Sequence, residues 1–217
     1  LYPEYTSSGY IMVLKHDSDG ISDEDMWKQL QKEYKDKYDM SWIGQYGFNN
    51  TYALIVREEA AKKYNLTKTS QLAEVSDELV FGGNSDYIER KDGFHLLCDT
   101  YGLKFKDVKD IDIGLKYEAL KKGDIDVSNG FTTDAQLSND NVRVLEDDKH
   151  LQVNYFCSNV VRNDTLKSHP GLEEAIMKLD NSITDKEMAS LNYKVEVEGK
   201  EDVQVAKDYL TEKGIIK

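Results

Sequence analysis

The sequence predicts an α/β fold in which a parallel or mostly parallel sheet is covered by helices. Short β-prone apolar runs alternate with segments of helical spacing between residues 51 and 127. Two of those helical segments are followed directly by glycine, a common C-terminal stop for a helix. This βαβα order favours parallel strands, and in such folds ligands bind beyond the carboxyl ends of the strands.

The stretch 47–56 carries a central strand and a candidate binding element. Residues 51–56 are too few for a helix and too apolar for a half-exposed hairpin strand, so we expect a buried strand. Asn49 and Asn50 come just before it. Asparagine at a strand entry can form an Asx-type turn with the local backbone or can bond a ligand. The stretch by itself leaves both roles open.

Helix caps define most of the remaining elements. Ser22, with Asp25 three residues later, predicts the start of a helix that ends near Tyr38, and Thr184 with Glu187 forms a capping box. Further helices are expected at residues 58–64, 70–75, 91–101, 115–122, 171–179 and 203–213, and glycines 102, 123 and 214 stop three of them. Further strands are expected at residues 79–83, from residue 124 and at residues 153–162.

Composition bounds the class of protein. The 217 residues suffice for one large domain or two lobes, and 39% hydrophobic with 32% charged residues is ordinary for a soluble protein. The net charge of −13 repels nucleic acid and anionic lipid, so neither is expected as a partner. The negative field favours a cationic ligand mildly, although it also serves solubility. The opening residues read like the middle of a domain, so we expect upstream residues to be missing or to belong elsewhere in a longer chain.

The reactive side chains do not indicate an enzyme. Cys98 and Cys157 are far apart and form no CxxC motif, so we expect packed thiols. Cys157 could pair with His95 or His169 as nucleophile and base, but no nucleophile motif surrounds this cysteine. We therefore expect no catalytic residues.

Metal ions and cofactors are not expected either. Residues 17–20 are similar to the start of a calcium loop, but the glycine at its sixth position is absent and Lys28 stands where glutamate should bind. His16 and His150 lie in acidic, polar surroundings typical of the surface. The sequence therefore predicts neither a metal site nor a cofactor.

Five motifs occur in a characteristic order along the chain. They are Tyr-Pro-Glu-Tyr-Thr at 2–6, Phe-Asn-Asn-Thr-Tyr-Ala-Leu at 48–54, Gly-Leu-Lys-Tyr-Glu-Ala-Leu at 114–120, Thr-Thr-Asp-Ala at 132–135 and Leu-Glu-Asp-Asp-Lys at 145–149. Together they resemble the osmoprotectant (glycine betaine, carnitine, choline) ABC-transporter substrate-binding proteins, from residue 1 to residue 217. The resemblance implies a two-lobed type II periplasmic-binding-protein fold whose first lobe lacks its N-terminal segment. It implies residues 1–50 in lobe one, 51–160 in lobe two and 161–217 in helices that return to lobe one.

The resemblance also implies a function. Members capture a quaternary ammonium compound in an aromatic cage between two lobes, and closure creates the surface that the transporter's membrane subunits recognise. Rings suit this ligand because a trimethylammonium group donates no hydrogen bonds and is attracted to their negative faces. Carried over by position, the cage is Tyr5, Tyr52, Phe131 and Tyr155, with Asn50 and Ser8 as polar neighbours. The implied location is extracytoplasmic: periplasmic, or anchored or permease-fused at a Gram-positive cell surface.

The chain departs from the family pattern near these positions. Ser7 and Ser8 replace a common Gly-Thr, Phe131 replaces a common tyrosine, and residues 44–47 replace a proline-rich approach. We hypothesise that these changes adapt the pocket to a non-standard quaternary or bulky cationic amine, although drift in a divergent homologue would produce them equally. The alternative interpretation is a fused or engineered ligand sensor built on this scaffold.

Overall fold

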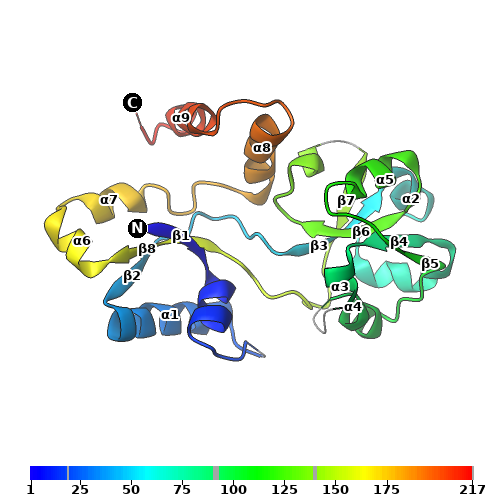
Figure 1. Cartoon of the computed structure of the whole chain (residues 1–217), viewed down its shortest axis with the longest axis horizontal. Helices are drawn as coiled ribbons and strands as arrows, with labels where there is room; N and C mark the ends of the chain where they lie inside the picture. Colours follow the sequence, from blue (N-terminus) through cyan, green and yellow to red (C-terminus); the bar gives the residue numbers. More distant parts are fainter. Residues whose placement is uncertain (19, 90–92, 139–140, 217) are drawn as a thin grey trace. The chain divides into compact units, whose positions relative to one another are not determined.

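The chain divides into two compact units in the computed structural model, which describes residues 1–18, 20–89, 93–138 and 141–216 (Figure 1). Unit 1 contains residues 1–51 and 153–217, and unit 2 contains residues 52–152. The sequence placed residues 51–160 in the second lobe. The stretch 153–160 lies instead in unit 1, because the strand it leads into pairs with two strands of that unit.

Unit 1 is built on a three-stranded antiparallel sheet. Its order is β1 (Tyr2–Tyr5), β8 (Cys157–Arg162) and β2 (Met40–Ile43), so β8 is central. Strand β8 is shorter than the expected 153–162, since regular pairing with its neighbours begins only at Cys157. The residues before it are held by the 49–51 stretch through an isolated β-bridge between Asn49 and Phe156 and through further hydrogen bonds, such as that from the Asn50 N–H to the Tyr155 carbonyl.

Helices pack on both faces of this sheet (Figure 1). Ser22 caps α1 (Asp23–Tyr38) as predicted, because its Oγ accepts from the Asp25 N–H at 3.1 Å. Helix α1 buries three side chains in a cluster with Trp42 and Val160 of the sheet. Val161 lies in a separate cluster with Ile176 of α7 (Leu172–Met177). The other helices of unit 1 are the π-helix η1 (Ser8–Val13), α6 (Asn163–Ser168), α8 (Asp185–Glu196) and α9 (Asp202–Glu212).

Unit 2 contains a five-stranded mixed sheet. Its order is β5 (Asp107–Asp110), β4 (Val80–Gly83), β6 (Val127–Phe131), β3 (Tyr52–Arg57) and β7 (Val142–Leu145). Strand β4 is parallel to β5 and β6, but β3 is antiparallel to β6 and β7. The prediction of a mostly parallel sheet was therefore wrong for both sheets. Parallel pairing occurs only among the strands within residues 80–131, which helical crossovers join.

Both faces of β3 are buried, which explains its continuous apolar run. Leu54 and Val56 pack in one cluster with residues of α2 (Glu58–Lys63), α3 (Ser85–Glu89) and α4 (Phe94–Tyr101). Ile55 packs on the opposite face with α5 (Lys116–Lys122). Gly102 and Gly123 end α4 and α5 in the left-handed conformation, as predicted. The expected start of α4 near residue 91 lies outside the described residues. The 3₁₀ helices are η2 (Thr69–Glu74), η3 (Ser76–Glu78) and η4 (Ala135–Ser138).

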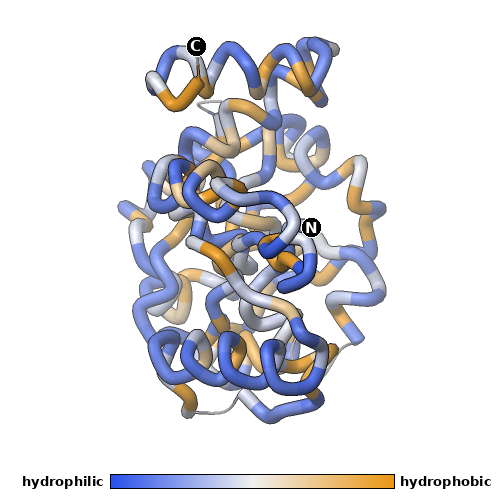
Figure 2. Tube along the Cα trace, turned by 90° about the vertical axis from the view of Figure 1, so that its left-hand side faces the viewer, coloured by the Kyte–Doolittle hydropathy of each residue, from blue (hydrophilic) through white to orange (hydrophobic). Residues whose placement is uncertain are grey.

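Apolar residues occur in short runs along the whole trace. Figure 2 shows them interspersed with hydrophilic residues along the coloured part of the trace. Within the described part of the chain, no helix is both long and apolar enough to cross a membrane.

Candidate ligand-binding site

Two aromatic residues meet where β3 begins and β6 ends. Tyr52 is the first residue of β3 and lies opposite Phe131, the last residue of β6. Their ring centroids are 4.9 Å apart and the ring planes differ by 26°, so the rings are stacked. Tyr87 adds a third ring, 5.4 Å from Tyr52. Phe131 remains 36% exposed, so this aromatic wall is accessible from outside unit 2.

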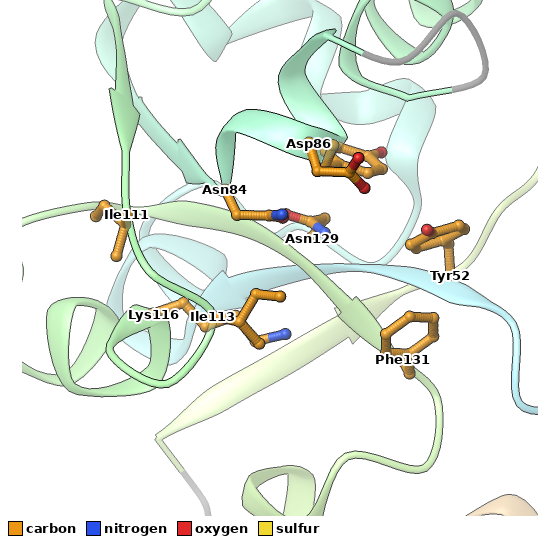
Figure 3. Close-up of a pocket in the computed structure, with 9 residues that line it drawn as sticks. Tyr52, Asn84, Asp86, Ile111, Ile113, Lys116, Asn129 and Phe131 are labelled. Carbon is orange, nitrogen blue, oxygen red and sulfur yellow. The ribbon is translucent and has the colours of Figure 1, made fainter.

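A pocket of about 210 Å³ lies beside this aromatic wall (Figure 3). Asn84 follows β4 directly, Ile111 follows β5 directly and Phe131 ends β6. The pocket is thus formed beyond the carboxyl ends of three parallel strands, where α/β folds bind their ligands. Its full lining is Tyr52, Asn84, Asp86, Tyr87, Ile111, Ile113, Lys116, Asn129 and Phe131.

The alternation of β6 places its side chains in this pocket. Val127, Asn129 and Phe131 share one face of the strand. Val127 is fully buried in the core, Asn129 is 7% exposed and lines the pocket, and Phe131 stands at its edge. Gly83 of β4 leaves room for these side chains, since a Cβ on it would lie 2.9 Å from Phe81 Cε1 and 3.0 Å from Asn129 Oδ1.

Asp134 fixes the end of β6. Its Oδ2 accepts hydrogen bonds from the Phe131 N–H at 3.1 Å and from the Tyr117 hydroxyl at 2.6 Å. The same oxygen pairs with Lys116 Nζ at 3.1 Å, and Lys116 is only 7% exposed. The Thr-Thr-Asp-Ala motif at 132–135 therefore has a structural role, because its aspartate holds both the backbone of Phe131 and a buried pocket lysine.

The sequence-derived site residues of unit 1 are joined by hydrogen bonds. The Asn50 N–H donates to the Tyr155 carbonyl at 3.0 Å. Tyr5 is half-buried at the end of β1, where burial raises the pKa of its hydroxyl and a side-chain hydrogen bond to Asn50 lowers it. Asn50 is therefore hydrogen-bonded to both Tyr5 and Tyr155.

Asn49 and Asn154 hold the backbone around Tyr155. Asn49 Oδ1 accepts from the Tyr155 N–H at 2.7 Å, and Asn49 Nδ2 donates to Asn154 Oδ1 at 2.7 Å. The Asn154 carbonyl accepts from the hydroxyls of Thr6 and Ser7 at 3.3 and 2.5 Å. Asn49 thus bonds a chain segment 105 and 106 positions away, which is a structural role but differs from the local Asx-type turn expected as one alternative.

The six sequence-derived residues fall into two groups. Tyr52 and Phe131 lie together in unit 2, whereas Tyr5, Ser8, Asn50 and Tyr155 lie in unit 1. Ser8 is the half-buried first residue of η1. Sequence reasoning missed most of the unit 2 pocket, namely Asn84, Asp86, Tyr87, Ile111, Ile113, Lys116 and Asn129. The rule that ligands bind beyond strand carboxyl ends could have indicated Asn84 and Ile111.

Both cysteines have the properties of packed thiols. Burial raises the pKa of the Cys157 thiol to about 12 and that of Cys98 to about 11, so little of either is nucleophilic thiolate at neutral pH.

Within the ranges that the structure describes, no three histidine, cysteine, aspartate or glutamate side chains gather closely enough to hold a metal ion.

The comparison with known families is decisive for identification. Residues 1–212 match the family described as the substrate-binding domain of the ABC-type glycine betaine transport system. The chain belongs to this family. It is therefore a substrate-binding domain rather than an enzyme, and the expected osmoprotectant-binding family is confirmed.

Several curated relatives of this glycine betaine family are similar over most of the chain. The ergothioneine transport permease/ergothioneine binding protein EgtU of Helicobacter pylori strain G27 is 36% identical over 215 residues, which cover 99% of this chain. The carnitine transport binding protein OpuCC of Listeria monocytogenes strain 10403S is 36% identical over 182 residues, or 83% of this chain. The chain spans only 38% of the length of EgtU and 59% of OpuCC.

A solved member of the group has the same fold. The crystal structure of a glycine betaine/carnitine/choline ABC transporter protein is 35% identical, with a TM-score of 0.91 over 98% of this chain and 78% of that one. Apo YehZ from Escherichia coli is 24% identical, with a TM-score of 0.83 over 99% of this chain and 80% of that one. The predicted two-lobed type II periplasmic-binding-protein fold is confirmed.

Proposed function

We propose that this chain is the extracytoplasmic solute-binding component of an ABC importer and captures a quaternary ammonium compound in an aromatic cage. Choline, glycine betaine, carnitine and related trimethylammonium compounds are the candidate ligands. The observation that carries this proposal is the stacked pair of Tyr52 and Phe131 at the edge of a pocket that also contains Asp86. Accessible ring faces beside a carboxylate form an environment that attracts a cation.

The four proposed cage residues are divided between the two units. Tyr52 and Phe131 come from unit 2, while Tyr5 and Tyr155 come from unit 1 and share Asn50 as a polar neighbour. Each desolvated cation–π contact contributes about 1–2 kcal/mol, so four rings contribute roughly 4–8 kcal/mol. A micromolar complex needs about 8 kcal/mol, so the rings, methyl burial and a few hydrogen bonds suffice after ordering costs.

The relatives support the ligand class. The names of the 36% identical proteins specify ergothioneine and carnitine, and a 30% identical protein from Pseudomonas aeruginosa PAO1 is named a glycine-betaine-binding protein. These three compounds share a trimethylammonium head and differ in the rest of the molecule. The shared head is what an aromatic cage recognises.

Calorimetric titration tests the cage. The purified protein is titrated with choline, glycine betaine, carnitine and ergothioneine, alongside Tyr52→Ala, Tyr155→Ala and the control Tyr38→Ala, which removes an exposed ring from α1. We expect saturable binding of at least one ligand, at least tenfold weaker in both cage variants and unchanged in the control. Absence of binding to all four ligands, or unchanged binding in both cage variants, would overturn the proposal.

The partners in this proposal are the membrane subunits of the transporter. A solute-binding domain delivers its ligand to these subunits, and it can be a free protein, lipid-anchored or fused to the permease. Reconstitution of the domain with a cognate transporter in liposomes tests this role. We expect ligand uptake to require both components, and uptake that is equally fast without the domain would contradict the proposed role.

A further inference from the structure

Lys116 is a buried cation in the lining of the pocket beside the aromatic wall. It is the first residue of α5 and is only 7% exposed, although lysine is almost never buried this deeply unless it is paired. Figure 3 shows its side chain extending from α5 toward Phe131. A buried charge has to be compensated by its surroundings, so the partners of this ammonium decide what the pocket can bind.

The protein satisfies the Lys116 ammonium only in part. Asp134 Oδ2 accepts from Lys116 Nζ at 3.1 Å, and the centroid of the Tyr117 ring lies 5.0 Å from the same nitrogen. An ammonium has three N–H donors. Among the residues that the structure describes, Asp134 is its only hydrogen-bond acceptor, so two donors remain for another group. Because buried polar groups are nearly always hydrogen-bonded, these donors indicate an acceptor bound in the pocket.

Asp134 shares its negative charge among several donors. The oxygen that pairs with Lys116 also accepts from the Phe131 N–H at 3.1 Å and from the Tyr117 hydroxyl at 2.6 Å. Gly130 makes room for this convergence, since a Cβ on it would lie 2.9 Å from Asp134 Oδ2. The carboxylate therefore fixes the position of the ammonium, and its charge is only partly available to neutralise that of Lys116.

The ammonium lies within reach of a small ligand that is held by the Phe131 ring. Lys116 Nζ and the Phe131 backbone nitrogen are each 3.1 Å from Asp134 Oδ2, so they are no more than about 6.2 Å apart. The other charged residue of the lining, Asp86, belongs to α3 and lies on the opposite side of Asn129 from Lys116 in Figure 3. The pocket thus presents a negative group and a positive group at separate places, which suits a ligand with both charges.

We propose that Lys116 binds the carboxylate of a zwitterionic ligand whose trimethylammonium head contacts the Tyr52 and Phe131 rings. Lys116 is then a specificity-determining residue, because it favours glycine betaine and carnitine over choline, which carries a hydroxyl in place of the carboxylate. A hydrogen bond between an ammonium and a carboxylate is about twice as strong as one between neutral groups. This inference rests on the proposed function and assigns the residue that recognises the second end of the ligand.

Two ligand pairs with a constant head test the carboxylate. Calorimetric titration compares glycine betaine with its amide and carnitine with its amide, so that within each pair a neutral amide replaces the carboxylate. The ratio of the two affinities is measured, because a general disturbance of the pocket weakens both members of a pair. We expect each carboxylate to bind about tenfold or more tightly than its amide.

Two variants assign this ratio to the Lys116 ammonium. Lys116→Met retains an unbranched apolar side chain and removes the charge. Because it leaves Asp134 without its cation, the double variant Lys116→Met, Asp134→Asn removes both charges and retains an acceptor for the Phe131 N–H. We expect the affinity ratio to fall to about one in both variants. The matched control is Lys121→Met, which removes an exposed cation from α5 outside the pocket lining and should leave the ratio unchanged.

The outcomes separate this inference from the proposed function. Equal affinity of the wild-type protein for each carboxylate and its amide would overturn the role of Lys116 and leave the cage intact. A carboxylate preference that persists in both Lys116 variants would also overturn it, and a lower melting temperature in these variants would then identify a purely structural pair with Asp134. Failure of the wild-type protein to bind any of the four ligands would instead reject the cage itself.

Discussion

Asn49 accepts a hydrogen bond from the Tyr155 N–H at 2.7 Å and so connects the two chain segments that lead from unit 1 into unit 2 and back. The neighbouring Asn50 N–H donates to the carbonyl of the same tyrosine at 3.0 Å. Tyr155 is therefore held on both sides of its peptide backbone by the Asn-Asn pair. This arrangement gives the two asparagines a positioning role for a proposed cage ring.

Replacement of Asn49 should affect both stability and binding. Asn49→Ala removes the acceptor of the Tyr155 N–H and the donor to Asn154. We expect a loss of about 1–3 kcal/mol in the free energy of unfolding and roughly tenfold weaker ligand binding. Urea denaturation and calorimetry measure the two effects. Asn163→Ala is the matched control: it removes hydrogen bonds to Ser41 and Asp39 in unit 1, so stability should fall while affinity stays constant. Equal loss of affinity in both variants would contradict the positioning role.

Substitution of Asp134 should reduce the stability of unit 2 more than most substitutions in that unit. Asp134→Ala leaves the buried Lys116 ammonium unpaired and removes the acceptor of the Phe131 N–H. We expect about 3 kcal/mol of destabilisation, since breaking a buried ion pair leaves an uncompensated charge. The comparison is Asp164→Ala, which breaks an exposed pair with Arg162 and should change the free energy of unfolding far less, because water screens exposed charges. Chemical denaturation measures the free energy of unfolding of both variants. Similarly small losses of this free energy in both would argue against a buried charge at Lys116.

Acid should destabilise unit 1 through Glu187. The hydrogen bond from Lys213, with help from the Thr184 cap, lowers the pKa of Glu187 from 4.5 to about 2. A carboxyl with a depressed folded-state pKa contributes stability above its unfolded pKa and loses it as the pH falls through the folded pKa. We therefore expect this contribution to disappear between about pH 4.5 and pH 2. Glu187→Gln should flatten the pH dependence of the melting temperature in that window, and an unchanged slope would refute the assignment.

The thiols should be inert in the folded protein. With thiol pKa values of about 12 for Cys157 and about 11 for Cys98, alkylation by iodoacetamide at pH 8 should be more than about a hundredfold slower than for a free cysteine. Mass spectrometry of alkylated samples measures this rate. Denaturant should restore normal reactivity at both sites, which provides the internal control. Rapid labelling of folded Cys157 would reopen the nucleophile interpretation.

Local signals predicted the individual elements well. The Thr184 capping box, the Ser22 cap and the left-handed Gly102 and Gly123 stops all occur in the structure. These features depend on contacts within a few residues along the chain, so sequence alone determines them. The family motifs likewise indicated Tyr52 and Phe131, and the pairing of β3 with β6 stacks these two rings.

The sequence by itself determined where helices begin and end, which strands are buried, and that the chain is a substrate-binding domain of the glycine betaine family. Tertiary structure alone decided that β3 runs antiparallel to β6 and that Asn84, Asp86 and Asn129 form one pocket with Tyr52. The physical reason is distance along the chain. Local spacing sets hydrogen bonds and caps. Strand direction and pocket composition depend instead on how segments about 30 to 80 positions apart in the sequence pack around a shared core.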